Sequence, residues 1–244
     1  MRKSWMKLAI AVPAVLVVLV TAGTWVYLNL IKDDPPDRLT LHGGTSTDPS
    51  AGTTAAAGDG TDTAADGSDA ESGIDGTWKV VSGSRAGYRV KEILFGQSAE
   101  AVGRTDDVTG TIAIEGSTVT RGSFTVDMTT VASDESRRDN QFRTRIMNVS
   151  AYPTSTFELS EPISLASVPE DGTEVGVKAT GRLTLRGTTK EVTVALQAQR
   201  SGSSIKVAGS VPVVFEEWGI PNPSFGPADT EDNGELEFLL VLGR

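Results

Sequence analysis

Residues 174–196 read EVGVKATGRLTLRGTTKEVTVAL, which is two alternating segments joined by a short turn. In the first segment the odd positions from 175 to 185 are apolar or glycine, and most even positions are polar. The second segment continues the alternation from Val192 to Leu196. A period of two residues is typical of a β-strand with one buried face, and Arg186-Gly187 is a good hairpin turn. These residues predict an antiparallel hairpin.

The same alternation recurs along residues 74–244, for example in Tyr88–Val90, Phe124–Met128 and Leu236–Leu240. Short turn sequences separate the runs: Glu115-Gly116-Ser117, Asp171-Gly172, Ser201-Gly202-Ser203 and Asn233-Gly234. We therefore predict an all-β domain, an antiparallel meander of about eight strands. Such a meander hides its edges by closing into a barrel. A sandwich with a fully packed core uses the same alternation and remains an alternative.

One segment breaks the strand pattern and predicts a short helix after Ser133. Ser133 is a suitable N-cap, and acidic residues at 134 and 135 favour the first turn. Phe142 and Ile146 are four residues apart and share one buried face. Pro153 ends the helix before Tyr152. The arginines of this helix are expected to be mostly exposed, closing one end of the barrel with a basic surface.

Residues 1–32 are predicted to be a cytoplasmic N-terminus followed by a transmembrane anchor. Residues 8–31 carry no charge, and as a helix they would span about 36 Å, more than the ~30 Å of a bilayer core. Arg2, Lys3 and Lys7 precede the run, which predicts an extracytoplasmic C-terminal domain at the cell membrane. A cleaved signal peptide is the competing interpretation, although its apolar region is usually shorter.

Residues 33–73 are predicted to be a disordered linker. They consist mainly of Thr, Ala, Gly, Asp and Pro, with almost no large apolar side chain. Such a segment cannot bury enough surface to offset the entropy of ordering it. The folded domain then occupies residues 74–244, held near the membrane but free to turn.

Composition excludes several classes of function. The 244-residue chain has a net charge of −10, which argues against a nucleic-acid partner, and no cysteine, which excludes disulfides and thiolate chemistry. The single histidine, His42, lies in the linker. We find no nucleophile elbow, phosphate-binding glycine loop or metal-ligand cluster. The sequence thus predicts a protein that is not an enzyme and has no metal or cofactor.

Several motifs in order resemble the YceI-like family of bacterial lipid-binding proteins. They are Trp78-Lys79-Val80 with Gly87-Tyr88-Arg89-Val90, the stretch 108–112, the Arg-rich segment with 148–157, and 181–190 followed by Val192-Thr193-Val194. The resemblance implies a lipocalin-like barrel whose apolar tunnel holds an isoprenoid or quinone-type lipid. It also implies a secreted or periplasmic location in the cell envelope, and no reaction. The family often has histidine where this chain has Asn140-Gln141 and Arg186, which puts histidine-dependent contacts in doubt.

The candidate ligand-binding residues are apolar side chains on the predicted inner face of the barrel, with two aromatic residues at its mouth. On the inner face they are Phe124, Val126, Phe157, Leu183, Val194, Leu196, Val207, Val213 and Phe238, and at the mouth Phe142 and Trp218. Taken singly, each is as easily explained by ordinary core packing. The arginines of the helix, Arg137, Arg138, Arg143 and Arg145, are candidates for contact with a phosphate head group or membrane surface.

The sequence therefore predicts a membrane-anchored binding protein for a polyisoprenoid or similar long-chain lipid. Its partners would be that lipid and the membrane, and a homo-oligomer remains open. The alternative function is a packed β-module that binds a protein or cell-envelope polymer and has no internal ligand.

Overall fold

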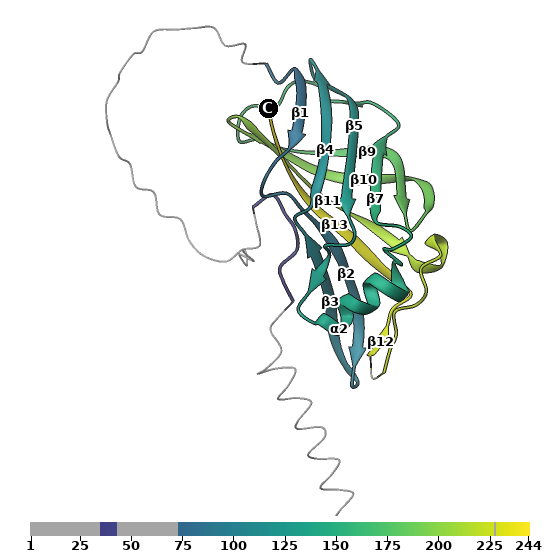
Figure 1. Cartoon of the computed structure of the whole chain (residues 1–244). Helices are drawn as coiled ribbons and strands as arrows, with labels where there is room; N and C mark the ends of the chain where they lie inside the picture. Colours follow the sequence, from purple (N-terminus) through teal and green to yellow (C-terminus); the bar gives the residue numbers. More distant parts are fainter. Residues whose placement is uncertain (1–34, 43–72, 227) are drawn as a thin grey trace, which may run out of the picture.

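The computed structural model describes residues 35–42, 73–226 and 228–244 (Figure 1). Two short helices, α2 (Ser136–Gln141) and the π-helix η2 (Phe142–Ile146), form one continuous segment, and a 3-10 helix, η3, spans Phe215–Trp218. The strands are β1 (Gly76–Val80), β2 (Arg85–Leu94), β3 (Gln97–Thr105), β4 (Val108–Glu115), β5 (Thr118–Asp127), β6 (Ala132–Ser133), β7 (Thr154–Leu159), β8 (Ile163–Ser164), β9 (Glu174–Leu185), β10 (Thr188–Ser201), β11 (Ser204–Val214), β12 (Ala228–Thr230) and β13 (Asn233–Gly243).

Eight of the strands close into an antiparallel barrel. The ring runs β1-β4-β5-β7-β9-β10-β11-β13, and β13 returns to β1 through the pair Val80 and Leu242. The predicted all-β barrel of about eight strands with one short helix is therefore confirmed. Every second side chain of each strand points into the barrel, because successive residues of a strand face opposite sides of the sheet.

The strand order departs from a simple meander near the N-terminal end of the barrel. β1 pairs with β4 rather than with β2, and β13 pairs with β1 at its C-terminal end and with β2 along its N-terminal half. The bend between β1 and β2 is fixed by the buried Ser84, whose hydroxyl donates to the carbonyl of Val81 and accepts from the N–H of Val241. β2 therefore continues the wall on the other side of this bend.

The predicted hairpin turn at Arg186-Gly187 forms as expected, with φ of +48° and +76° at the two residues. Positive φ at both positions is the type I′ geometry that matches the twist of the flanking strands. Asn233-Gly234, in contrast, is not a turn, since both residues lie inside β13. Gly234 is required there because a Cβ would lie 2.7 Å from a methyl group of Val90.

The helical segment begins two residues later than the sequence predicts. Ser133 belongs to β6 and pairs with Gly103, so its backbone is unavailable as an N-cap. Glu135 is the N-cap instead, and its carboxylate accepts from the N–H of Arg137 at 3.2 Å. Ser133 still supports the helix, because its hydroxyl donates to Asp139 at 2.6 Å.

The two ends of the barrel differ, and we name them by what they carry. At the α2 end lie α2, β12, the tip of the β2–β3 hairpin and the turn at Arg186 (Figure 1). Arg186 joins the helix to this end, because its Nε donates to the carbonyl of Ile146 at 2.8 Å. At the far end, the turns at Gly172 and Gly202 meet through a bond from the N–H of Gly202 to Asp171.

Residues 35–42, which we call the strap, lie along the outer face of the barrel beside β2 and β3 (Figure 1). The strap belongs to the segment 33–73 that is predicted to be a disordered linker, and in the structure its backbone is bonded to the barrel. The other linker residues before 73 lie outside the described residues. The predicted membrane segment, 8–31, also lies outside them. No helix in the described part of the chain has the length and apolar character needed to cross a bilayer.

Candidate functional site

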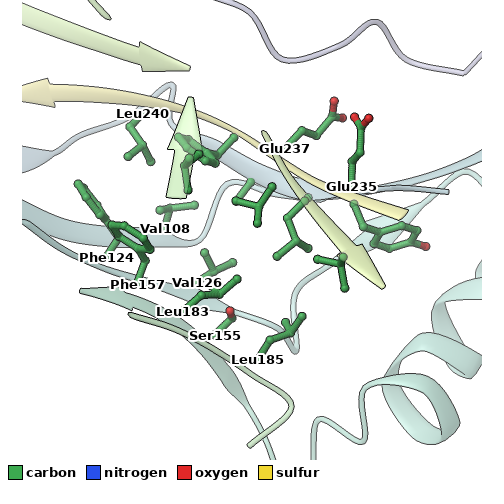
Figure 2. Close-up of a pocket in the computed structure, with 18 of the residues that line it drawn as sticks. Val108, Phe124, Val126, Ser155, Phe157, Leu183, Leu185, Glu235, Glu237 and Leu240 are labelled. Atoms are coloured by element: carbon green, nitrogen blue, oxygen red, sulfur yellow. The ribbon is translucent and has the colours of Figure 1, made fainter. Parts of the chain in front are cut away.

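The barrel encloses a cavity of about 1050 Å³. This volume lies at the upper end of the ~300–1,000 Å³ that is usual for small-molecule sites. Side chains from many strands point into it, among them Phe124, Phe157 and Leu183 (Figure 2). The lining reaches exposed residues at both ends, Phe225 at the α2 end and Val168 at the far end. The inner face is therefore hollow, whereas the packed-module alternative requires a solid core.

An apolar row crosses the middle of the wall because three strands place aromatic or branched side chains in register. Phe124 of β5 is paired with Phe157 of β7, which is paired in turn with Leu183 of β9. Directly opposed residues point to the same face of a sheet. The alternation that predicts each strand therefore also places these three side chains side by side on the cavity wall.

The structure brings nearly all of the predicted apolar residues to this cavity. Ten of the eleven line it: Phe124, Val126, Phe142, Phe157, Leu183, Val194, Leu196, Val207, Val213 and Phe238. Trp218 does not, because it lies in η3, buried in an apolar cluster with Leu185 and Phe215, and Lys190 lies over its ring at 5.5 Å. For Trp218, ordinary packing is the better interpretation.

The four predicted arginines do not form one site. Only Arg137 and Arg138 reach the cavity lining. Arg145 donates to backbone carbonyls of Asn222 and Pro223, at 3.2 and 3.0 Å, and so holds a loop. Arg143 is partly exposed and away from the lining. Of the four arginines predicted to contact a head group, only two therefore lie at the cavity.

Arg138 is not the exposed cation that the sequence suggests. Its side chain is only 19% exposed and lies between two carboxylates. Glu92 is 3.4 Å away, and Asp134, one helical turn earlier, also pairs with it. Glu92 is itself buried on the cavity wall. The charge of Arg138 is thus compensated within the protein.

Sequence reasoning missed Glu92 and Tyr88 as wall residues. Both follow from register, because Tyr88, Val90, Glu92 and Leu94 are alternate residues of β2 and all line the cavity. Extending the alternation to Glu92 would have placed its carboxylate on the inner face of the barrel. An acidic residue near the end of a strand is, however, equally typical of an exposed position. Tyr88 stacks on Phe142, with ring centroids 5.1 Å apart.

Burial raises the pKa of the Tyr88 phenol well above its usual value of about 10. Above about pH 10 the unfolded chain releases the phenol proton, while the folded chain keeps it up to a higher pH. The free energy of unfolding therefore falls as pH rises above about 10. We expect this group alone to cost up to about 1.4 kcal/mol at pH 11. Equilibrium unfolding at pH 9 and pH 11 should show a smaller loss for Tyr88→Phe than for the native chain. Equal losses in the two proteins would contradict this assignment.

A closed antiparallel barrel around an apolar cavity defines a lipocalin-like binding barrel. The YceI-like domain family matches residues 78–242 of this sequence, and the chain belongs to that family. No curated protein matches the sequence significantly.

One solved structure superposes well enough to show the same fold, and others are more distantly similar. A polyisoprenoid binding domain from Saccharophagus degradans, implicated in plant cell wall breakdown, superposes with a TM-score of 0.55 at 14% identity, covering 68% of this chain and 97% of that chain. BcnA from Burkholderia cenocepacia is similar with a TM-score of 0.48 at 18% identity, over 63% and 95% of the two chains. The YCEI protein of Campylobacter jejuni gives a TM-score of 0.43 at 16% identity, over 55% and 82%.

Proposed function

We propose that this protein binds a polyisoprenoid, or a quinone-type lipid with a similar tail, inside the barrel. The observation that carries the proposal is the cavity of about 1050 Å³, which is lined mainly by aliphatic and aromatic side chains. Each CH₂ that moves from water into such a site contributes roughly 0.8 kcal/mol. A long unbranched or isoprenoid tail therefore suits the site better than a compact polar molecule.

Family membership supports the same function. The match covers residues 78–242, which include every strand of the closed ring from β4 onward and most of β1. The similar domain from Saccharophagus degradans is described as polyisoprenoid binding. We propose a binding role rather than a catalytic one.

We propose that the lipid head group lies at the α2 end. Several charged side chains of the lining gather there: Glu92, Asp134, Glu135, Arg137 and Arg138. Because Arg138 is already paired with two carboxylates, it has little net charge to offer a phosphate. The arrangement favours a head group that is uncharged and accepts hydrogen bonds, as a quinone does. Arg137 remains the candidate for contact with a charged group.

We also propose that residues 8–31 anchor the protein in the cell membrane, with the barrel on the extracytoplasmic side. The uncharged run and its basic N-terminal flank support this placement. An anchored carrier would exchange its lipid with the bilayer beside it.

The test is to identify what the protein carries. The full chain would be purified, transferred into nanodiscs of a single synthetic phospholipid, extracted with organic solvent and examined by mass spectrometry. We expect about one isoprenoid or quinone-type lipid per protein and none from empty nanodiscs. An extract without such a lipid, combined with no uptake of added isoprenoids, would refute the proposed function.

A further inference from the structure

The α2 end carries a group of exposed apolar side chains beside the opening of the cavity. Ile93, Phe95 and Phe225 are 50%, 56% and 50% exposed. Phe95 and Phe225 belong to the cavity lining, whereas Ile93 is on the outer face of the same hairpin. Phe225 joins β12 by a bridge to Ala228, which pairs with Leu94 of β2. The three side chains therefore belong to neighbouring segments, and we call them the apolar rim.

Phe95 has a backbone conformation that local preferences disfavour. Its φ is +51°, and Gly96 follows with +81°, so the β2–β3 turn has positive φ at both central positions. Asn, Asp or Gly is preferred at such positions, and a bulky side chain is an outlier. The residue is 56% exposed, so packing within the chain covers less than half of it. A large apolar side chain held at an exposed turn is typical of a contact surface.

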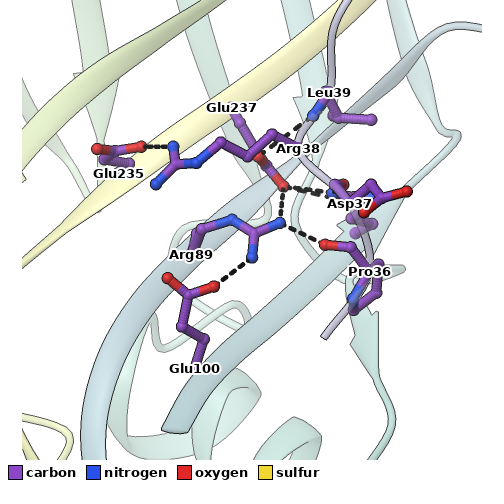
Figure 3. Close-up of polar contacts among 9 residues, drawn as sticks. Pro36, Asp37, Arg38, Leu39, Arg89, Glu100, Glu235 and Glu237 are labelled. Carbon is purple, nitrogen blue, oxygen red and sulfur yellow. Dashed lines mark hydrogen bonds and ion pairs between the residues drawn. The ribbon is translucent and has the colours of Figure 1, made fainter. Parts of the chain in front are cut away.

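The strap provides a second, independent observation about this end. Arg89 of β2 donates to the carbonyl of Pro36 at 2.5 Å (Figure 3). Arg104 of β3 donates to the carbonyl of Asp37. Arg38 pairs with Glu235 of β13. Three strands thus hold the strap on the outer face.

The other half of the strap is fixed as well, which gives the strap a direction. Leu41 is only 3% exposed, and Nε2 of His42 lies 3.0 Å from the carboxylate of Glu174. Glu174 is the first residue of β9 at the far end, while Arg89, which holds Pro36, is halfway along β2. The strap therefore runs from the far end at residue 42 toward the α2 end at residue 35.

This direction limits how far from the α2 end the proposed membrane segment could begin. The predicted segment ends at Ile31, four residues before Pro35, so the connection reaches at most ~14 Å. From Arg89 to the tip at Phe95 is about 20 Å along β2. If the proposed anchor spans the bilayer, its outer end lies within ~14 Å of Pro35, and a bilayer there can meet the apolar rim.

We propose that the apolar rim is a membrane-docking surface, held against the bilayer by the strap so that the cavity opens directly toward the lipid phase. The proposal rests on the proposed function for its anchor and its lipid cargo. Phe95 and Phe225 enter the head-group region. The guanidinium of Arg137, which lies 5.3 Å from the Phe225 ring centroid, stays at the polar level. A lipid tail then moves between bilayer and barrel without crossing water.

The absence of cysteine in the sequence allows a direct test on the full chain. Phe95→Cys would be labelled with an environment-sensitive fluorophore, and Ser203→Cys, in the exposed β10–β11 turn at the far end, would serve as the matched control. Both proteins would be reconstituted into phosphatidylcholine vesicles that contain lipids with a quencher on the acyl chain. We expect quenching several-fold stronger at position 95. Equal quenching at the two positions, or none at either, overturns the proposal.

A charge substitution separates docking from lipid binding. Neither Ile93 nor Val81 lines the cavity, and both are exposed, but Val81 lies in the β1–β2 bend, away from the apolar rim. In the labelled Phe95→Cys protein, Ile93→Glu should reduce quenching several-fold, whereas Val81→Glu should not. If Ile93→Glu leaves quenching unchanged, the rim does not dock.

The native chain in the same vesicles, extracted for mass spectrometry, keeps the two proposals apart, because position 95 itself lines the cavity. Bound lipid with no selective quenching at position 95 refutes docking and leaves the binding function standing. Selective quenching without bound lipid supports docking and counts against the binding function.

Discussion

Gly122→Trp is expected to abolish lipid binding while the barrel still folds. Gly122 lies on β5, and the nearest atoms to a Cβ at this position belong to Leu159, Ile112 and Phe124, at 3.5–3.7 Å. These are ordinary contact distances, so a side chain is accommodated at its base. All three neighbours line the cavity. The indole would therefore project into the space that we propose for the lipid tail.

The matched control is Gly176→Trp on β9. A Cβ at position 176 would have no atom within 4 Å, and Gly176 alternates with the wall residues Val175 and Val177, so its substituent points away from the cavity. We expect at least a tenfold loss of bound lipid for Gly122→Trp, which is about 1.4 kcal/mol or more, and no loss for Gly176→Trp. Fluorescence titration with an isoprenoid analogue measures both. Native affinity in Gly122→Trp would show that the ligand binds elsewhere.

The sequence predicted the barrel and its wall because both depend on local alternation. Phe124, Phe157 and Leu183 each lie in a strand with a clear period of two. Pairing of these strands in register places the three side chains on the same face of the sheet. Strand pairing at the β1–β2 bend was not predictable in the same way. It depends on the buried hydroxyl of Ser84, whose partner Val241 is 157 residues away in the chain.

The strap was missed for a related physical reason. Composition predicts disorder when a segment has too few apolar groups to bury, and residues 35–42 have only two large ones, Leu39 and Leu41. The strap is held instead by charged side chains of the barrel, which bond to its backbone carbonyls. Nothing in the sequence of the strap itself records these partners. For Arg138 of α2 the error is the opposite one. The sequence predicts an exposed side chain, but Arg138 is paired with Glu92 from a distant strand.

The charged cluster under the strap should contribute strongly to stability, and Glu237→Gln tests it. Glu237 is 3% exposed, and its carboxylate lies 2.7 Å from Arg104 and 3.6 Å from Arg89, which is also buried. The Nε of Arg89 has no hydrogen-bond partner among the described residues, so the cluster already contains one unsatisfied donor. Removing one partner from a buried pair typically costs about 3–5 kcal/mol, and Glu237→Gln leaves Arg104 without its carboxylate while Arg89 keeps Glu100 at 2.6 Å. We expect a loss in that range by chemical unfolding.

The control for this prediction is Glu158→Gln, which breaks the exposed pair between Glu158 and Arg182. Exposed pairs contribute about 1 kcal/mol or less to the free energy of unfolding. A similar loss of stability in the two variants would contradict the prediction that the buried cluster contributes more. A second measurement locates the effect. Because the N–H of Leu39 donates to Glu237 at 3.4 Å, Glu237→Gln should also loosen the strap. Trypsin would then cleave after Arg38 faster than in the native chain or in Glu158→Gln.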